Sequence, residues 1–136
     1  MILGKLSLGF TVIELMVVLI VSAILSSIVI PNYTRLQTHA KYSHLKQTAY
    51  SLQMAVETFF LYHGVYPNLN SIEQLLALLN QESLIKQIPK NPFTKEPFSS
   101  LDPSGKVTYV YDESAQLYQL EVYDKSNETV LLMLSN

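Results

Sequence analysis

The chain has 136 residues, which suits one domain of ordinary size and leaves little room for a second independent core. Its formal net charge is -2 at pH 7, so it lacks the basic excess that nucleic-acid-binding proteins normally carry, and no nucleic-acid partner is expected. The sequence contains no cysteine, which excludes a disulfide scaffold, a thiolate metal site and a cysteine nucleophile.

Residues 10–30 form an apolar segment in which Glu14 is the only charged residue. As a helix, such a segment spans roughly 30 Å, the thickness of the hydrocarbon core of a bilayer. A cleaved secretory signal, a single-pass membrane anchor and a buried core helix are the three competing interpretations. The segment is long for a secretory signal, and it is apolar nearly all round between Leu15 and Leu25 rather than along one face. A membrane-inserted helix is therefore favoured.

Glu14 is the residue that a plain membrane anchor does not explain. An ionised carboxylate inside hydrocarbon costs at least a few kcal/mol and is normally paired. One alternative is that Glu14 lies close enough to the start of the segment to reach the headgroups. The other is a positive partner, and no Lys or Arg lies from Thr11 to Thr34. Such a partner would be Lys5, Arg35 or an α-amino group.

Beyond Pro31 the apolar residues are confined to one helical face. This face contains Tyr42, Leu45, Ala49, Leu52, Val56 and Phe59. The pattern predicts a helix that ends at about His63, before Gly64, and that is bent or locally melted at Pro31, because proline removes a hydrogen-bond donor.

The remainder of the chain predicts an α+β fold of the kind in which a short helix and an antiparallel sheet cover one long helix. Ser71-Ile72-Glu73-Gln74 is a capping-box pattern ahead of a short helix from about Ile72 to Leu79. Four prolines between Pro89 and Pro103 predict a connecting loop, with two turns that present Phe93 and Phe98.

Three runs rich in β-branched and aromatic residues follow, at residues 107–111, 117–123 and 129–134. They predict an antiparallel sheet of three, or at most four, strands. Alternation in the middle strand indicates that Tyr118, Leu120 and Val122 face the long helix.

No catalytic machinery is visible, and we do not expect an enzyme. His39, His44 and His63 do not have the spacing of a zinc motif, and none belongs to an HExxH sequence. The sequence also lacks the G-x-S-x-G, P-loop and dinucleotide-binding glycine patterns.

The stretch Gly9-Phe10-Thr11-Val12-Ile13-Glu14-Leu15 resembles the class III signal of type IV pilins and pseudopilins. The resemblance implies a cleaved leader at residues 1–9, with prepilin peptidase cutting between Gly9 and Phe10 and with N-methylation of Phe10. It implies that Glu14 pairs with the Phe10 ammonium of a neighbouring subunit during assembly, which makes two buried charges compatible. Pro31 falls at the family's helix-kink position.

The resemblance also divides the chain by role. Residues 10–30 would be the transmembrane and polymerisation half of the long helix. Residues 31–136 would be a globular pilin-like domain that includes the amphipathic half of that helix.

Two further stretches, residues 62–67 and 88–93, are similar to major pseudopilins of type II secretion systems. This implies a homo-oligomeric filament that works with an inner-membrane assembly platform and minor pseudopilins. The subunit would cross the bacterial inner membrane once, with its C-terminal domain in the periplasm, before it enters a periplasmic filament. The alternative is a surface or competence pilin, with a role in adhesion, motility or DNA uptake.

A count of positive charges argues against this orientation. Lys5 precedes the apolar segment, whereas Arg35, Lys41 and Lys46 follow it closely. The positive-inside rule applied to this count alone favours a cytoplasmic C-terminal domain. The family resemblance implies the opposite.

Major pseudopilins often bind calcium in a late loop, and hard cations prefer oxygen ligands. The residues of this tail with suitable side chains are Asp112, Glu113, Asp124, Asn127 and Glu128. Their spacing matches no firm motif, so solvated turns are the competing interpretation and the presence of a metal is left open.

Overall fold

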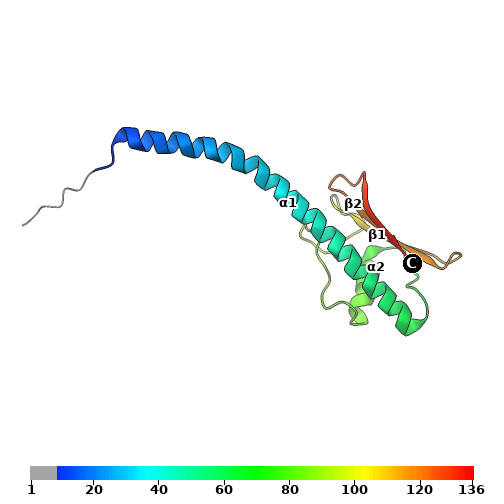
Figure 1. Cartoon of the computed structure of the whole chain (residues 1–136). Coiled ribbons are helices and arrows are strands. Elements are labelled where there is room, and N and C mark those ends of the chain that lie inside the picture. Colours follow the sequence, from blue (N-terminus) through cyan, green and yellow to red (C-terminus); the bar gives the residue numbers. More distant parts are fainter. Residues whose placement is uncertain (1–8) are drawn as a thin grey trace, which may run out of the picture. The chain divides into compact units, whose positions relative to one another are not determined.

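The computed structural model describes residues 9–136. The elements are α1 (Val12–His63), α2 (Ile72–Gln81), β1 (Val107–Asp112), β2 (Leu117–Tyr123) and β3 (Val130–Ser135), shown in Figure 1. The chain divides into two compact units, Met1–Thr38 and His39–Asn136, with the boundary inside α1. The expected α+β fold, with a long N-terminal helix, a short helix and an antiparallel sheet, is confirmed.

Helix α1 is continuous over its 52 residues, so the backbone is not melted at Pro31, and the expected bend there stays a prediction. The helix ends at His63 as expected. Gly64 has a φ of 74°, and its N–H donates to the Phe60 carbonyl at 2.7 Å. A left-handed residue at this position suits glycine and closes the last helical turn.

The predicted apolar face of α1 forms the core of the second unit. Five of its six residues are at most 8% exposed, and the sixth, Tyr42, packs half-buried at the edge. The buried five are Leu45, Ala49, Leu52, Val56 and Phe59. The helical period of the apolar residues therefore predicted the buried face correctly, because burial of this face is what stabilises the amphipathic half of the helix.

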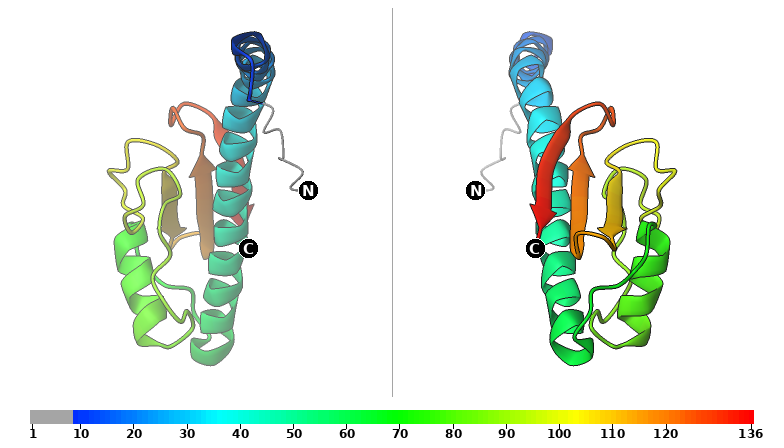
Figure 2. Two further views of the ribbon diagram at one scale, coloured as in Figure 1. Left: turned by 90° about the vertical axis from the view of Figure 1, so that its left-hand side faces the viewer. Right: turned by 90° about the vertical axis from the view of Figure 1, so that its right-hand side faces the viewer.

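The sheet has three antiparallel strands in the order β1-β2-β3, and Figure 2 shows it lying against the second half of α1 with α2 beyond β1. Leu120 pairs with Tyr109 on one side and Leu134 on the other. The face of β2 predicted to be buried is at most 1% exposed at Tyr118, Leu120 and Val122. The alternation of residues along β2 predicted this face because a strand presents successive side chains to opposite faces.

Hydrogen bonds to Glu57 connect the end of α1 to the sheet. Its two carboxylate oxygens accept the hydroxyls of Tyr118 at 2.6 Å and Tyr66 at 3.1 Å. Nearby, the Tyr109 hydroxyl donates to the Pro67 carbonyl at 2.9 Å. Burial, together with the hydrogen bond to Glu57, raises the pKa of Tyr118. These tyrosines are core residues whose polar ends are satisfied inside the unit.

The capping box expected at Ser71 is wrong. Ser71 is the N-cap of α2, but its side chain makes no bond to the helix backbone and donates to Glu73 instead. The other oxygen of Glu73 accepts the Ser99 hydroxyl at 2.9 Å and both the N–H and the hydroxyl of Ser100 at 2.7 Å. Three of the four hydrogen bonds to Glu73 come from Ser99 and Ser100, so Glu73 connects α2 to the proline-rich loop. Together these charge-assisted bonds stabilise the fold more than a single capping bond from Ser71 to the helix backbone would.

The loop between Pro89 and Pro103 turns its phenylalanines inward. Phe98 is 1% exposed and Phe93 packs half-buried against the core, so the turns present both phenylalanines to the interior of the unit. Asn91, fully buried, holds the loop by donating to the Ser104 carbonyl at 2.8 Å and accepting the Phe93 N–H at 2.9 Å. These two bonds satisfy backbone polar groups in a loop that lacks regular backbone pairing.

We expect Leu52→Ala to lower the free energy of unfolding of the second unit by about 2–5 kcal/mol, because it removes a side chain that is 1% exposed. Met54→Ala, two residues further on and 71% exposed, should change it by less than about 0.5 kcal/mol. Denaturant titration of the detergent-solubilised chain, followed by near-ultraviolet circular dichroism, measures both. Equal effects would contradict the assignment of the two helix faces.

Glu73 predicts a specific acid sensitivity. Burial opposes its ionisation, but hydrogen bonds from Ser71 and Ser100 outweigh it and lower the pKa of Glu73 from 4.5 to about 2. A depressed folded-state pKa contributes stability above the unfolded value, and that stability is lost as pH falls from about 4.5 towards 2. Glu73→Gln should flatten the loss of stability in this pH range, whereas Glu113→Gln, an exposed control, should follow the parent chain.

Candidate assembly site at the start of the apolar helix

Thr11 and Glu14 form a capping box at the start of α1. The Glu14 Oε2 atom accepts the backbone N–H of Thr11 at 2.9 Å and the Thr11 hydroxyl at 2.8 Å. In return, the Glu14 N–H donates to the Thr11 Oγ1 at 3.3 Å. The sequence Thr11-Val12-Ile13-Glu14 has the S/T-x-x-E spacing of this motif, a signal that our reading of the sequence missed.

The capping box leaves half of the Glu14 carboxylate open. Oε2 carries both bonds to Thr11, whereas Oε1 accepts no hydrogen bond from any residue that the structure describes. Beside it, Phe10, Ile13, Glu14, Val17 and Val18 line a hollow of about 370 Å³. A carboxylate with one oxygen held and the other free is oriented to receive a cation.

No cation of the described chain reaches this carboxylate. Over residues 9–136 the one ion pair joins His63 to Glu82, so Arg35 is not the partner of Glu14. Arg35 lies 21 positions after Glu14 in the helix, which corresponds to roughly 30 Å along its axis. Lys5, the other candidate within the chain, lies outside the described residues. A group from another molecule remains the candidate partner.

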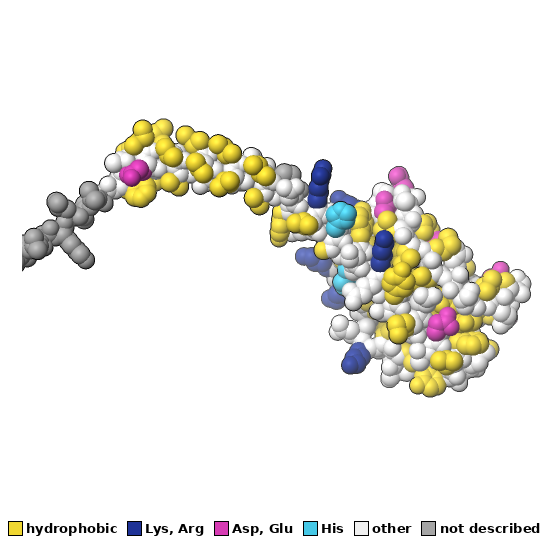
Figure 3. Space-filling view, in the orientation of Figure 1, with side chains coloured by type: hydrophobic (Ala, Val, Ile, Leu, Met, Phe, Trp, Pro, Cys, Tyr) yellow, Lys and Arg dark blue, Asp and Glu magenta, His cyan; other side chains and the backbone are white. Residues whose placement is uncertain are grey.

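The apolar side chains around Glu14 are uncovered. Their exposed fractions range from 48% at Val21 to 76% at Val12, and Figure 3 shows them as a nearly continuous hydrophobic surface. This contradicts the core-helix interpretation for the described chain. Helix α1 is long and apolar enough to cross a membrane. A surface of this kind requires lipid or other apolar helices around it.

Gly9 and Phe10 precede the first turn of α1 in non-helical conformation. Phe10 is 75% exposed, and among the described residues no atom beyond the chain neighbours of Gly9 lies within 4 Å of the position that a Cβ of Gly9 would occupy. The backbone between them is thus sterically accessible. Cleavage at this bond, N-methylation of Phe10 and a helix kink at Pro31 stay predictions, and residues 1–8 of the expected leader lie outside the description.

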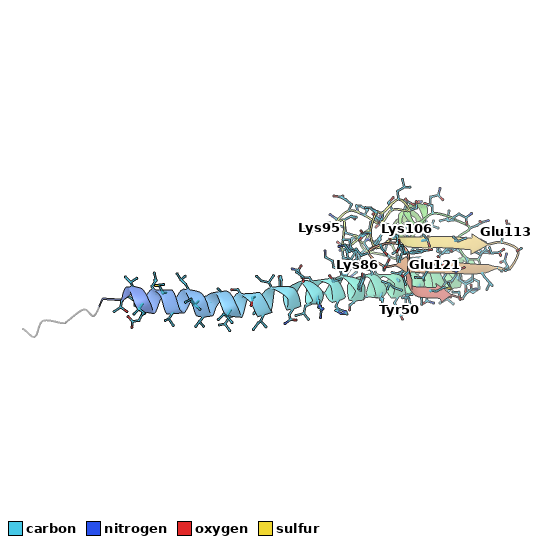
Figure 4. The ribbon with its side chains drawn as sticks, turned by 90° about the horizontal axis from the view of Figure 1, so that it is seen from above. Tyr50, Lys86, Lys95, Lys106, Glu113 and Glu121 are labelled. Carbon is cyan, nitrogen blue, oxygen red and sulfur yellow. The ribbon has the colours of Figure 1, made fainter. Side chains whose placement is uncertain are left out.

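The acidic residues considered for calcium do not converge. Asp112 and Glu113 lie at the β1–β2 hairpin, whereas the loop between β2 and β3 contains Asp124, Asn127 and Glu128 at the other end of β2. Figure 4 shows Glu113 beyond the end of β1. Within residues 9–136 there is no group of three His, Cys, Asp or Glu side chains that could hold a metal ion.

The loop residues have structural roles instead. Hydrogen bonds from Ser126 are the main reason that the pKa of Asp124 is lowered. The Asn127 side chain accepts the Lys106 N–H at 3.0 Å and donates to the Asp102 carbonyl at 2.8 Å. These are the bonds of ordered polar turns.

An uncovered apolar helix with an acid in its first turn, followed by an α+β unit with a three-stranded sheet, is the architecture of a pilin-like subunit. The type II secretion system core protein G of Escherichia coli (strain K12) is 28% identical over 95 residues, covering 62% of this chain and 66% of that protein. The core protein G of Vibrio cholerae is 28% identical over 109 residues, 74% of each chain.

The type IV major pilin protein PilA of Myxococcus xanthus is 42% identical over 52 residues, which cover 38% of this chain and 24% of that pilin. No protein-family model and no solved structure matches the chain. The named relatives confirm the resemblance predicted from residues 9–15: the chain is related to the type IV pilins and pseudopilins. They support a structural subunit, and none of the three names is that of an enzyme.

The capping box predicts that Thr11→Val frays the start of α1, since it removes one donor to Glu14 and the acceptor for the Glu14 N–H. Loss of an N-cap costs about 1 kcal/mol, which corresponds to roughly fivefold faster amide exchange. Hydrogen exchange at the Glu14 amide of the detergent-embedded chain measures this. Thr11→Ser keeps the hydroxyl and should exchange at the parent rate; equal rates for the two variants would show that the cap contributes nothing.

Proposed function

We propose that this chain is a structural subunit of a type IV pilus-like filament, most specifically a major pseudopilin of a type II secretion system. The observation that carries the proposal is Glu14, a half-open carboxylate in the first turn of an uncovered apolar helix. Such an acid is too costly to keep in hydrocarbon without a positive partner, and it is oriented to receive one.

In this proposal prepilin peptidase cuts between Gly9 and Phe10 and so creates the partner. The new α-amino group of Phe10, N-methylated, pairs with the open oxygen of Glu14 in a neighbouring subunit. Each charge alone is unfavourable in a low-dielectric medium, and pairing the two offsets that cost. The pair sets the register at which the incoming helix joins the filament, and the uncovered side chains of residues 12–30 pack against those of its neighbours.

The proposed cellular path follows from this. Residues 10–30 anchor the subunit in the bacterial inner membrane, with residues 31–136 in the periplasm and the kink at Pro31 between them. An inner-membrane assembly platform transfers subunits into a periplasmic filament, together with minor pseudopilins. This orientation is the opposite of the one that the positive-inside rule favours from the positions of Lys5, Arg35, Lys41 and Lys46, and it is adopted here on the family resemblance.

A surface or competence pilin is the second candidate, and the 42% identity to PilA over 52 residues favours it. The matches to core protein G favour the pseudopilin. They extend over 95 and 109 residues, further than the 52 residues of α1, and therefore include part of the second unit, whereas the match to PilA is no longer than that helix. We take the pseudopilin as the better supported function.

The test is Glu14→Gln in a bacterium that supplies a prepilin peptidase and an assembly platform. Glutamine retains the shape and an acceptor for Thr11 but removes the charge, so we expect normal membrane insertion and loss of nearly all filament. Filaments are scored by shearing and immunoblotting, and mass spectrometry of the subunit reports cleavage before Phe10. Glu128→Gln removes the same charge at an exposed loop and should assemble normally. Wild-type filament yield from Glu14→Gln would refute the charge-pairing account.

A further inference from the structure

A groove in the second unit is lined by apolar residues and by several hydrogen-bond donors that have no partner in the described chain. It consists of two adjoining hollows of about 400 and 320 Å³ between α1 and the segment that follows α2. The polar residues that line it are His44, Gln47, Thr48, Ser51, Lys86, Gln87 and Lys90. None of the residues that line it is acidic, and the side chains of Lys86 and Lys90 pair with no carboxylate in the described chain. We call it the basic groove.

Thr48 shows that the groove is a polar site rather than bare surface. It is only 9% exposed, and its hydroxyl makes no hydrogen bond with the described chain. Elsewhere on α1, the hydroxyls of Ser51 and Thr58 donate to the carbonyls four residues earlier, at 3.0 and 2.7 Å. No fully buried side-chain polar atom of the described residues lacks a partner, so the Thr48 hydroxyl is open to the groove, where water or a ligand can bond to it.

The chemistry of the lining selects an anionic, hydrogen-bond-accepting ligand. Lys86 and Lys90 contribute positive charge, and Thr48, Gln47 and Gln87 contribute donors at its floor and walls. A carboxylate at the tip of a protruding segment would satisfy both. The chain itself presents such a segment.

The β1–β2 hairpin ends in a rigid acidic tip. Asp112 Oδ1 accepts the Ser114 N–H at 2.9 Å, the Ser114 hydroxyl at 2.6 Å and the Ala115 N–H at 3.2 Å, so the turn is ordered by its own side chain. The Glu113 carboxylate, by contrast, has no partner among the residues described. The hairpin therefore presents one free carboxylate on a fixed turn.

The groove and the hairpin tip lie at opposite ends of the unit. Lys86 and Glu113 are at its two ends in Figure 4. Contacts agree: Gly105, next to the start of β1, lies beside Leu45, whereas Tyr118 near the tip donates to Glu57. Residues 45 and 57 are separated by roughly 18 Å along a helix. One molecule cannot join its own two ends, but two molecules in succession can.

We propose that the basic groove of one subunit receives the Glu113 hairpin tip of the next subunit in the filament. The contact is heterologous, and a heterologous contact that does not close generates an open-ended assembly. Charge complementarity between the two ends orients the globular units relative to one another, in addition to the pairing at Glu14. The inference rests on the filament function proposed above, which names the partner as a second copy of this chain.

The test uses the absence of native cysteine. Gln87→Cys and Ala115→Cys are introduced together in the full-length chain, one beside the groove and one on the hairpin turn, with Glu113 and the lysines retained. A short bismaleimide applied to cells that carry filaments should give a ladder of covalently joined subunits. The matched control combines Ala115→Cys with Lys125→Cys, an exposed position in the β2–β3 turn, and should stay monomeric.

Charge reversal supplies the second readout. Glu113→Lys, or Lys86→Glu with Lys90→Glu, should each reduce the ladder several-fold, and the three substitutions combined should restore it. Filaments that form normally, with a ladder no stronger than the control, would overturn the groove contact and leave the filament function intact. A parent chain that yields no filaments in a competent host would overturn both. Restoration by the triple variant would exclude misfolding as the reason for the single losses.

Discussion

One constraint governs this protein: an apolar helix surface that remains exposed in the part of the chain that the structure describes. The large apolar side chains from Val12 to Ile30 are about half to three-quarters exposed. Water is an unfavourable environment for such a surface, so the segment must be in lipid or among other helices. Within that environment an acid is the exceptional group, and the capping box with Thr11 satisfies only one oxygen of Glu14.

The second unit also contains apolar helix surface, but there the chain covers it. Its half of α1 has a single apolar face, and α2 and the sheet cover that face. Few polar side chains are buried. Asn91 bonds to the proline-rich loop and the half-buried Glu57 accepts two tyrosine hydroxyls, whereas the Thr48 hydroxyl has no partner within the described chain. The unit is thus self-contained, which leaves its outer surfaces, including the basic groove, available for contacts with other molecules.

Local pattern was a good guide where a period or a motif decides the structure. The end of α1 at His63, the buried face from Leu45 to Phe59 and the inner face of β2 followed from periodicity, because burial selects every third or fourth residue of a helix and every second residue of a strand. Local pattern did not predict the partners of a polar side chain that has several donors within reach. Glu73 bonds Ser99 and Ser100, which lie 26 and 27 residues away, and no local rule identifies them.

The apolar segment, the acid within it, the family resemblance and the order of helices and strands all followed from the sequence, because these depend on composition and on spacing between near neighbours. The sequence also contained the Thr11-x-x-Glu14 capping box, although only the bond distances revealed it. Folding was needed to show that the phenylalanines of the loop turn inward and that the calcium candidates lie at two ends of β2. It alone placed Thr48 beside Lys86 in one groove. Those relations join residues far apart in the chain, and only the packing of the folded unit determines which of them meet.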